Sequence, residues 1–176
     1  MSDPVNPAEH AIVWVAQGFG IGRIPQAPGT WGSLLGVAWT ALLLLPQSLP
    51  VYLGGAILGA AASVWLCGRA EQILKAHDPG SVVLDEIIAL PFCFLPWGMW
   101  KLTLTKSMPA PAELFSTWNG GLCLAVFALF RVFDIWKPWP VRQSQRFPGG
   151  LGVTLDDLLA AVYVALILTA WLWCWR

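Results

Sequence analysis

The residues best suited to chemistry in this sequence are carboxylates that stand immediately before apolar segments. Asp85 and Glu86 precede one such segment, and Asp156 and Asp157 precede another. An unpaired carboxylate is costly at a membrane boundary, so each pair calls for a counter-charge, either a basic side chain or a metal ion. Because no paired Cys or His accompanies these acids, an oxygen-only ligand set favours a hard cation, above all Mg²⁺.

Each acidic segment also has a purely structural interpretation. Asp78 precedes a proline and fits a helix N-cap, and Thr154 with Asp157 has the form of a capping box. Asp134 and Lys137 are three residues apart, so they share a helix face and can form a surface ion pair. Capping alone rarely needs so many carboxylates. The candidate metal ligands are therefore Asp85, Glu86, Asp134, Asp156 and Asp157, and the candidate catalytic residues are Asp78, Asp85, Glu86 and Asp134.

A glycine-rich segment, residues 18–33, has the features of a phosphate cradle. Its Pro-Gly pair predicts a turn, after which Thr30 or Ser33 caps the first long helix. Free backbone N–H groups at a helix start, with Arg23 nearby, suit a phosphate. The alternative is a loop whose glycines only let helices pack closely. A Mg²⁺ site beside basic side chains suits a phosphoryl substrate, and the candidate substrate-binding residues are Arg23, Thr30, Ser33, Arg131 and Lys137.

Other phosphatase mechanisms lack their residues in this chain. The four cysteines stand singly and none is followed by an arginine six residues later, so we interpret them as small buried hydrophobic residues. No Asp-x-Asp pair is present, and one of the two histidines, His10, lies in the N-terminal tail. The chemistry that remains is water activated by a metal ion, or a carboxylate nucleophile.

The elements that position these residues belong to an integral membrane protein. The chain has 176 residues, of which 57% are hydrophobic and 11% are charged, and its mean hydropathy is +0.64. A soluble domain carries about 25% charged residues, so the composition excludes a water-soluble fold and also a disordered chain. The zero net charge argues against a nucleic-acid partner. We expect one membrane-embedded domain over residues 1–176, with residues 1–10 as a flexible tail and no cleaved signal peptide.

The apolar segments predict an all-α, polytopic helical bundle with four to five spanning or partly spanning helices. A helix needs about 20 apolar residues to cross a bilayer. The candidate segments are 33–45, 51–68, 87–100, 114–130 and 158–175, of which the first and third are short. Residues 11–22 are apolar but too few to cross, and we expect them to form an N-terminal helix that lies at the membrane interface or against the bundle.

If the segments cross the membrane in turn, their connections alternate sides and the charges can be sorted between the two sides. If all five segments cross, seven of the ten basic residues lie on one side, together with every acid from Asp78 to Asp157 except Glu113. The positive-inside rule places that side in the cytoplasm. This organisation favours a membrane enzyme with a cytoplasmic site. A small cation-coupled transporter or channel would use the same carboxylates, but it would spread them through the depth of the membrane.

Four segments carry a more specific signal: APGTWGS at 27–33, HDPGSVVLDE at 77–86, FRVFDIWKPWPVR at 130–142 and GGLGVTLDD at 149–157. In this order they resemble the phosphatidylglycerophosphatase A family of bacterial inner-membrane lipid phosphatases. The resemblance implies Mg²⁺-dependent removal of the terminal phosphate of phosphatidylglycerophosphate to give phosphatidylglycerol. It implies the lipid substrate and the bilayer as partners, and it leaves the oligomeric state open.

Two positions depart from the family pattern. Ala89 and Ala161 replace glycines that the family often has after its Asp-Glu and Asp-Asp pairs. Each adds a methyl group at an expected helix contact, so we expect an effect on local packing rather than on activity. A phosphotransferase that joins lipid head groups is a further alternative, and it would need a second substrate pocket.

Overall fold

The computed structural model describes residues 6–174, with Trp118 described by its backbone alone. Within that range the chain is helical and has no strands, which confirms the predicted all-α class. The elements are α1 (Pro7–Ala16), η1 (Ile21–Arg23), α2 (Pro28–Leu44), α3 (Leu49–Leu74), α4 (Leu84–Thr105), α5 (Pro111–Leu114), α6 (Thr117–Trp136), α7 (Val141–Ser144) and α8 (Gly150–Cys174).

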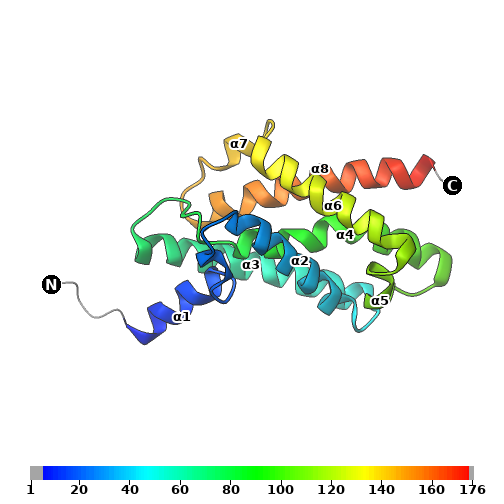
Figure 1. Ribbon diagram of the computed structural model, residues 1–176, viewed down its shortest axis with the longest axis horizontal. Coiled ribbons are helices and arrows are strands. Elements are labelled where there is room, and N and C mark those ends of the chain that lie inside the picture. Colours follow the sequence, from blue (N-terminus) through cyan, green and yellow to red (C-terminus); the bar gives the residue numbers. More distant parts are fainter. Residues whose placement is uncertain (1–5, 175–176) are drawn as a thin grey trace.

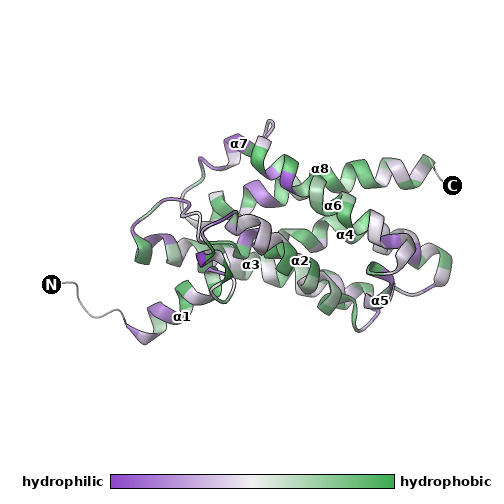
Figure 2. Ribbon diagram, in the orientation of Figure 1, coloured by the Kyte–Doolittle hydropathy of each residue, from purple (hydrophilic) through white to green (hydrophobic). Residues whose placement is uncertain are grey.

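The five long helices α2, α3, α4, α6 and α8 pack side by side and alternate in direction along the chain (Figure 1). Segments 17–27, 75–83 and 137–149 therefore meet at one end of the bundle, and segments 45–48 and 106–116 meet at the other. Hydrophilic residues gather toward these ends, while the middle of the bundle is mainly hydrophobic (Figure 2). These are the two groups of connections that the prediction of five crossing segments placed on opposite sides.

The length and composition of the helices agree with a membrane bundle. Four of them, α3, α4, α6 and α8, are long and apolar enough to cross a membrane. The fifth, α2, has 17 residues and extends about 25 Å at the usual helical rise. In α4, 22 residues remain helical although Pro91 and Pro96 lie inside, and the Tyr52 hydroxyl of α3 donates a 2.7 Å hydrogen bond to the Pro91 carbonyl. Prolines are tolerated in membrane helices where neighbouring helices support the backbone.

The core is built around α4, which packs against α2, α3 and α8. Close approach of α2 depends on small residues, because a Cβ at Gly36 would lie only 2.8 Å from the side chain of Leu90. Ala89 and Ala161 are fully buried in this core. Their methyl groups are therefore at helix contacts, as expected.

The N-terminal region differs from its prediction. Asn6 and Glu9 form a capping box that starts α1, so residues 7–10, which we expected in a flexible tail, form the first turn of a helix. Residues 1–5 of that tail lie outside the described residues. The apolar segment 11–22 is not one helix, because two glycines with positive φ separate α1 from η1. The α1 helix packs against α3.

Candidate active site

Arg131, near the end of α6, connects three helices at the acidic end of the bundle. Its Nη1 donates a 2.5 Å hydrogen bond to Asp134 Oδ2 and a 3.4 Å hydrogen bond to Glu86 Oε1 on α4. The same nitrogen lies 3.5 Å from Ser33 Oγ on α2, and the Ser33 hydroxyl itself donates to the Gly29 carbonyl. One guanidinium therefore holds carboxylates from two helices beside the start of a third.

Lys137, the residue that follows α6, forms the second positive centre. Its Nζ donates a 2.5 Å hydrogen bond to Asp156 Oδ2 on α8, and Gln145 Nε2 donates to the same oxygen at 2.9 Å. Gln145 Nε2 also donates to Asp78 Oδ2 at 3.3 Å. Burial lowers the pKa of Lys137, but the hydrogen bond to Asp156 and the surrounding carboxylates outweigh it, so this pKa lies above its ordinary value. Lys137 is thus a permanent cation at physiological pH.

The remaining carboxylates of this end exceed the cations available to them. Asp85 is 6% exposed, and within the described part of the chain its Oδ1 accepts only the adjacent Glu86 backbone N–H, at 3.0 Å. Asp157 is 4% exposed, and none of the hydrogen bonds or ion pairs among residues 6–174 involves its side chain. Glu86 Oε2 is buried and has no hydrogen-bond partner in the described part of the chain. Buried negative groups without partners are costly, so this cluster calls for added positive charge.

The glycine-rich segment packs directly onto this cluster. A Cβ at Gly29 would overlap Glu86 Oε1 and lie 2.9 Å from both terminal nitrogens of Arg131. A Cβ at Gly32 would lie 2.9 Å from Glu86 Oε2 and 2.7 Å from the Val83 Cβ. The glycines therefore do permit close packing, and the group that they approach is the buried ion-pair network.

The donor chemistry of the cluster fits a hard cation such as Mg²⁺. The atoms of this cluster that could coordinate a metal ion are carboxylate oxygens. One of them, Glu86 Oε2, is buried and has no hydrogen-bond partner among the described residues, so it is available to bind a cation. Among the described residues, however, no three His, Cys, Asp or Glu side chains already converge as a metal-binding group. Coordination by several of these carboxylates would therefore need their side chains to move toward the ion.

Comparison with known proteins identifies the family. The family model described as phosphatidylglycerophosphatase A matches residues 14–172. The chain belongs to this family. It is 34% identical over 157 residues to phosphatidylglycerophosphatase A of Haemophilus influenzae, covering 89% of this chain and 85% of that protein. No solved structure matches the chain.

Two further relatives show the breadth of names among similar proteins. Phosphatidylglycerophosphatase A of Escherichia coli is 38% identical over 156 residues, which cover 88% of this chain and 79% of that protein. A Bacteroides thetaiotaomicron protein, provisionally named a phosphatidylinositol-3-phosphatase, is 36% identical over 165 residues, 92% of this chain and 93% of that protein. All three relatives carry phosphatase names.

As a member of the phosphatidylglycerophosphatase A family, the chain is an enzyme, a multi-pass bacterial membrane phosphatase. The transporter alternative is not supported. The acids of α3, α4, α6 and α8 lie toward one end of the bundle, where those of α4 occupy its first turn and that of α6 its last. An ion path would instead need acids through the depth of the membrane.

Three predictions about which residues cap the start of a helix are wrong. Asp78 is not an N-cap, because α4 begins only at Leu84. Thr154 lies inside α8 rather than before it, and its buried hydroxyl forms a 3.1 Å hydrogen bond with that of Ser63 on α3. The α2 helix already begins at Pro28, so neither Thr30 nor Ser33 caps it, and the Ser33 hydroxyl donates back to the Gly29 carbonyl.

The basic candidates divide into two groups. Arg131 and Lys137 lie in the cluster. In place of the predicted surface ion pair between Asp134 and Lys137, Asp134 pairs with Arg131, and Lys137 pairs with Asp156. Arg23 is engaged elsewhere, because its Nε donates a 2.7 Å hydrogen bond to Gln17 Oε1.

Thr30, the remaining substrate candidate, is half-buried in the first turn of α2. Its side chain takes part in none of the hydrogen bonds found within residues 6–174. The structure therefore places Ser33 beside Arg131 and Lys137 beside Asp156, but within residues 6–174 it gives Thr30 no hydrogen bond to the acids.

Two residues of this site were missed by sequence reasoning. Gln145 bridges Asp156 and Asp78, and no pattern in its connecting segment singles it out. Glu71, near the end of α3, accepts the Asp78 backbone N–H at 2.8 Å and lies 2.8 Å from His77 Nδ1. Its signal was an isolated acid at the end of a long apolar helix, which is costly unless it has a partner.

Proposed function

We propose that this protein hydrolyses phosphatidylglycerophosphate to phosphatidylglycerol and phosphate in bacterial phospholipid synthesis. The observation that supports this most directly is the joining of α2, α4, α6 and α8 by Arg131 and Lys137 within one cluster of carboxylates. Phosphoryl transfer needs cations placed around the phosphate oxygens and acids placed around the nucleophile. The cluster offers both at the end of a membrane bundle, where a lipid head group lies.

Arg131 and Lys137 are the proposed phosphate-binding residues. Arginine matches phosphate oxygens with paired donors, and lysine supplies a compact charge. Both are now held by Asp134 and Asp156, so a phosphate would compete with these carboxylates. Ser33, beside Arg131, is the proposed additional donor. Arg23 and Thr30 stay candidates for the glycerol portion of the head group.

Mg²⁺ is the proposed cofactor, held by a subset of Asp85, Glu86, Asp134, Asp156 and Asp157. When bound, it would neutralise phosphate oxygens and lower the pKa of a coordinated water. The buried, unpartnered Glu86 Oε2 supports this assignment, together with the side chain of Asp157, which has no partner among the described residues.

The carboxylates of the cluster would accept and donate the protons of this reaction. Water attacks phosphorus, the bond from phosphorus to the glycerol oxygen breaks, and the water proton passes to a carboxylate. The leaving oxygen then takes up a proton to give the phosphatidylglycerol hydroxyl. Asp85, Glu86 and Asp134 are the proposed acids for these transfers, and Asp78, held through Gln145, is a proposed helper.

The site is proposed to face the cytoplasm from the inner membrane. Seven of the ten basic residues belong to the end that carries the cluster, which the positive-inside rule places in the cytoplasm.

Purified protein in detergent with defined lipids tests this function by phosphate release, with Mg²⁺ and with excess EDTA. The matched comparison is phosphatidylinositol 3-phosphate, because a relative carries that name. We expect phosphatidylglycerophosphate to be hydrolysed at least tenfold faster, and only with the metal. Faster hydrolysis of the inositol lipid would overturn the substrate assignment, and full activity in EDTA would overturn the metal.

A further inference from the structure

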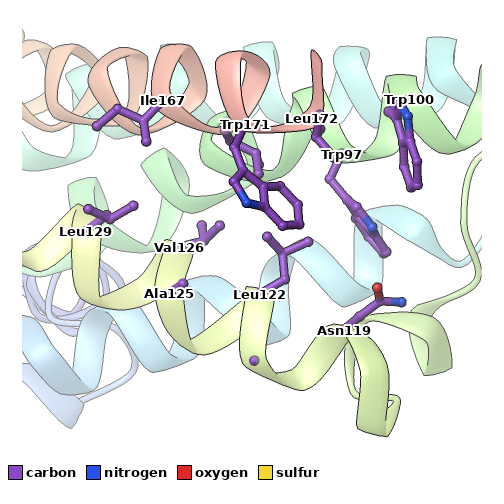
Figure 3. A pocket seen from close by; sticks show the side chains of 12 residues that line it. Trp97, Trp100, Asn119, Leu122, Ala125, Val126, Leu129, Ile167, Trp171 and Leu172 are labelled. Carbon is purple, nitrogen blue, oxygen red and sulfur yellow. The ribbon is translucent and has the colours of Figure 1, made fainter. Parts of the chain in front are cut away.

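A large apolar pocket lies between α4, α6 and α8, with a volume of about 670 Å³. Figure 3 shows Leu129 and Ile167 at one end of the pocket, and Trp97, Trp100 and Asn119 at the other. Because α6 ends and α8 begins at the carboxylate cluster, the end that carries Leu129 is the one nearer to the cluster. Apart from the Asn119 amide and the indole nitrogens, the side chains that line the pocket are hydrocarbon.

The pocket begins a short distance from the carboxylates. On α6, Leu129 lies five residues before Asp134, a rise of about 7.5 Å. On α8, Ile167 lies ten residues beyond Asp157, about 15 Å along the helix. From Leu129 the pocket extends along α6 to Asn119, a further rise of about 15 Å. A ligand that used both the cluster and the pocket would therefore need a polar group, a linker and a long apolar chain.

Two stacked aromatic rings occupy the interval between the cluster and the pocket. Leu129 and Phe133 are four residues apart on α6, and Tyr163 and Ile167 are four residues apart on α8, so each pair shares a helix face. The rings of Phe133 and Tyr163 stack with their centroids 5.1 Å apart. Nearer the polar end of the bundle, the lysine–aspartate ion pair of the site joins the end of α6 to α8. The junction of these two helices thus presents an ion pair, an aromatic pair and an apolar pocket in that order.

The side of the pocket is open to the surroundings of the bundle. Gly121 and Ala125 are exposed, and Ile167 and Trp171 are 40% and 46% exposed. A chain from an unattached lipid would gain little by entering, because bilayer hydrocarbon is as apolar as these walls. A chain tethered to a head group that the site already holds enters at a high effective concentration. The pocket is therefore best suited to a chain of the molecule bound at the cluster.

We propose that the pocket binds one acyl chain of the lipid substrate, an assignment that rests on the proposed function. The terminal phosphate lies at the cations of the cluster, the glycerol groups pass the Phe133–Tyr163 pair, and the chain runs along Val126 toward Asn119. A glycerophospholipid carries its phosphate, glycerol and acyl groups in this order, which is the order of the surfaces along α6 and α8. The pocket consequently makes the enzyme prefer substrates whose acyl chains are long enough to fill it.

Two alanines of α6 provide a matched pair of variants. Ala125 and Ala128 are both exposed, and of these two only Ala125 lines the pocket. We would measure phosphate release from dioleoyl and dihexanoyl phosphatidylglycerophosphate in the same detergent. We expect the natural protein and Ala128→Phe to show a kcat/KM at least tenfold higher for the dioleoyl lipid, mainly through KM. In Ala125→Phe the ring fills the pocket, and this ratio should fall at least fivefold. Partitioning of the lipids into micelles is the same for each protein, so it does not affect the comparison between variants.

The dihexanoyl lipid also reports whether each variant is folded, because its short chains do not need the pocket. If Ala125→Phe loses activity toward both lipids, Gly121→Leu and Gly120→Leu repeat the comparison. A Cβ at either glycine has no atom within 4 Å, and of the two only Gly121 lines the pocket.

Three outcomes would contradict the assignment in different ways. A chain-length ratio unchanged in the pocket variants would overturn the acyl-chain site and leave the proposed function intact. An unchanged ratio together with loss of a co-purified lipid from these variants would assign the pocket to a structural lipid instead. Absence of hydrolysis of both lipids by the natural protein would overturn the proposed function, and the acyl-chain site with it.

Discussion

The Lys137 ammonium group and the Asp156 carboxylate lie 2.5 Å apart, although 19 residues separate them along the chain. This pair ties the end of α6 to the second turn of α8. It places a permanent positive charge beside Asp157, whose side chain has no partner among the described residues. The contact thus combines a structural link with a phosphate-binding charge.

Replacing Lys137 should separate these two roles. Lys137→Gln removes the charge, and we expect phosphate release to fall at least tenfold with KM increased, whereas Lys137→Arg should retain much of the rate. The pKa of Lys137 is raised in the fold, so its stabilising contribution is complete below the ordinary lysine pKa, near 10.4. That contribution is lost only as the pH rises through the higher folded value. The pH–rate profile of Lys137→Arg between pH 6 and 9 should therefore keep the shape of the natural protein.

Asp157 offers the clearest distinction between chemistry and helix stabilisation. Because its side chain has no partner within residues 6–174, Asp157→Asn should leave thermal stability nearly unchanged and lower the rate by at least 100-fold. Asp85→Asn should behave similarly. Asp156→Asn also weakens the contact with Lys137, so it should lose about 1–3 kcal/mol of stability in addition. Near-normal rates in all three folded variants would show that these acids are structural.

Metal binding should be detectable without turnover. A cation that binds the folded protein raises its unfolding temperature by mass action. We expect Mg²⁺ to raise the melting temperature of the natural protein in detergent. The control is the melting temperature measured with Ca²⁺ at equal ionic strength. The increase should be absent in Asp85→Asn with Asp157→Asn. An equal increase in the natural protein and the double variant would place the ion elsewhere.

The orientation of the bundle can be tested with two cysteines at opposite ends. Gln143 and Ser107 are both exposed, in the connections after α6 and α4 respectively. In a Cys174→Ser background, Gln143→Cys should resist an impermeant thiol reagent in intact spheroplasts and react after lysis. Ser107→Cys should react in both conditions. The reverse pattern would place the carboxylate cluster outside the cytoplasm.

The opposite end of the bundle has its own pH-sensitive contact. The hydrogen bond from Lys101 lowers the pKa of Glu113, and the Ala110 backbone N–H at 3.0 Å adds to this effect. A lowered carboxyl pKa gives stability that is present above the unfolded value, about 4.3, and lost as the pH falls through the folded value. Glu113→Gln should therefore melt slightly below the natural protein at pH 7, and this difference should shrink as the pH falls below the unfolded value. Phosphate release should be unaffected, because this pair lies far from the cluster.

The sequence by itself determined the class of fold and the set of chemical groups. Hydrophobic segments near membrane length, and acids confined to their polar ends, allow few arrangements because apolar and charged groups must separate between lipid and water. The four short motifs added the family. The prediction of five crossing segments also gave correctly which connections share an end of the bundle, since antiparallel helices return the chain to the same side.

Only the tertiary structure decided which charged groups pair. Local spacing suggested Asp134 with Lys137, but Arg131 takes Asp134, and Lys137 reaches across to Asp156. Local spacing likewise suggested caps at Asp78 and Thr154. These failures share a cause: helix packing brings distant side chains within hydrogen-bond distance, and a buried contact outweighs a local one that water would weaken. The pocket beside Trp97 was undetectable for the same reason, because its walls come from three separate helices.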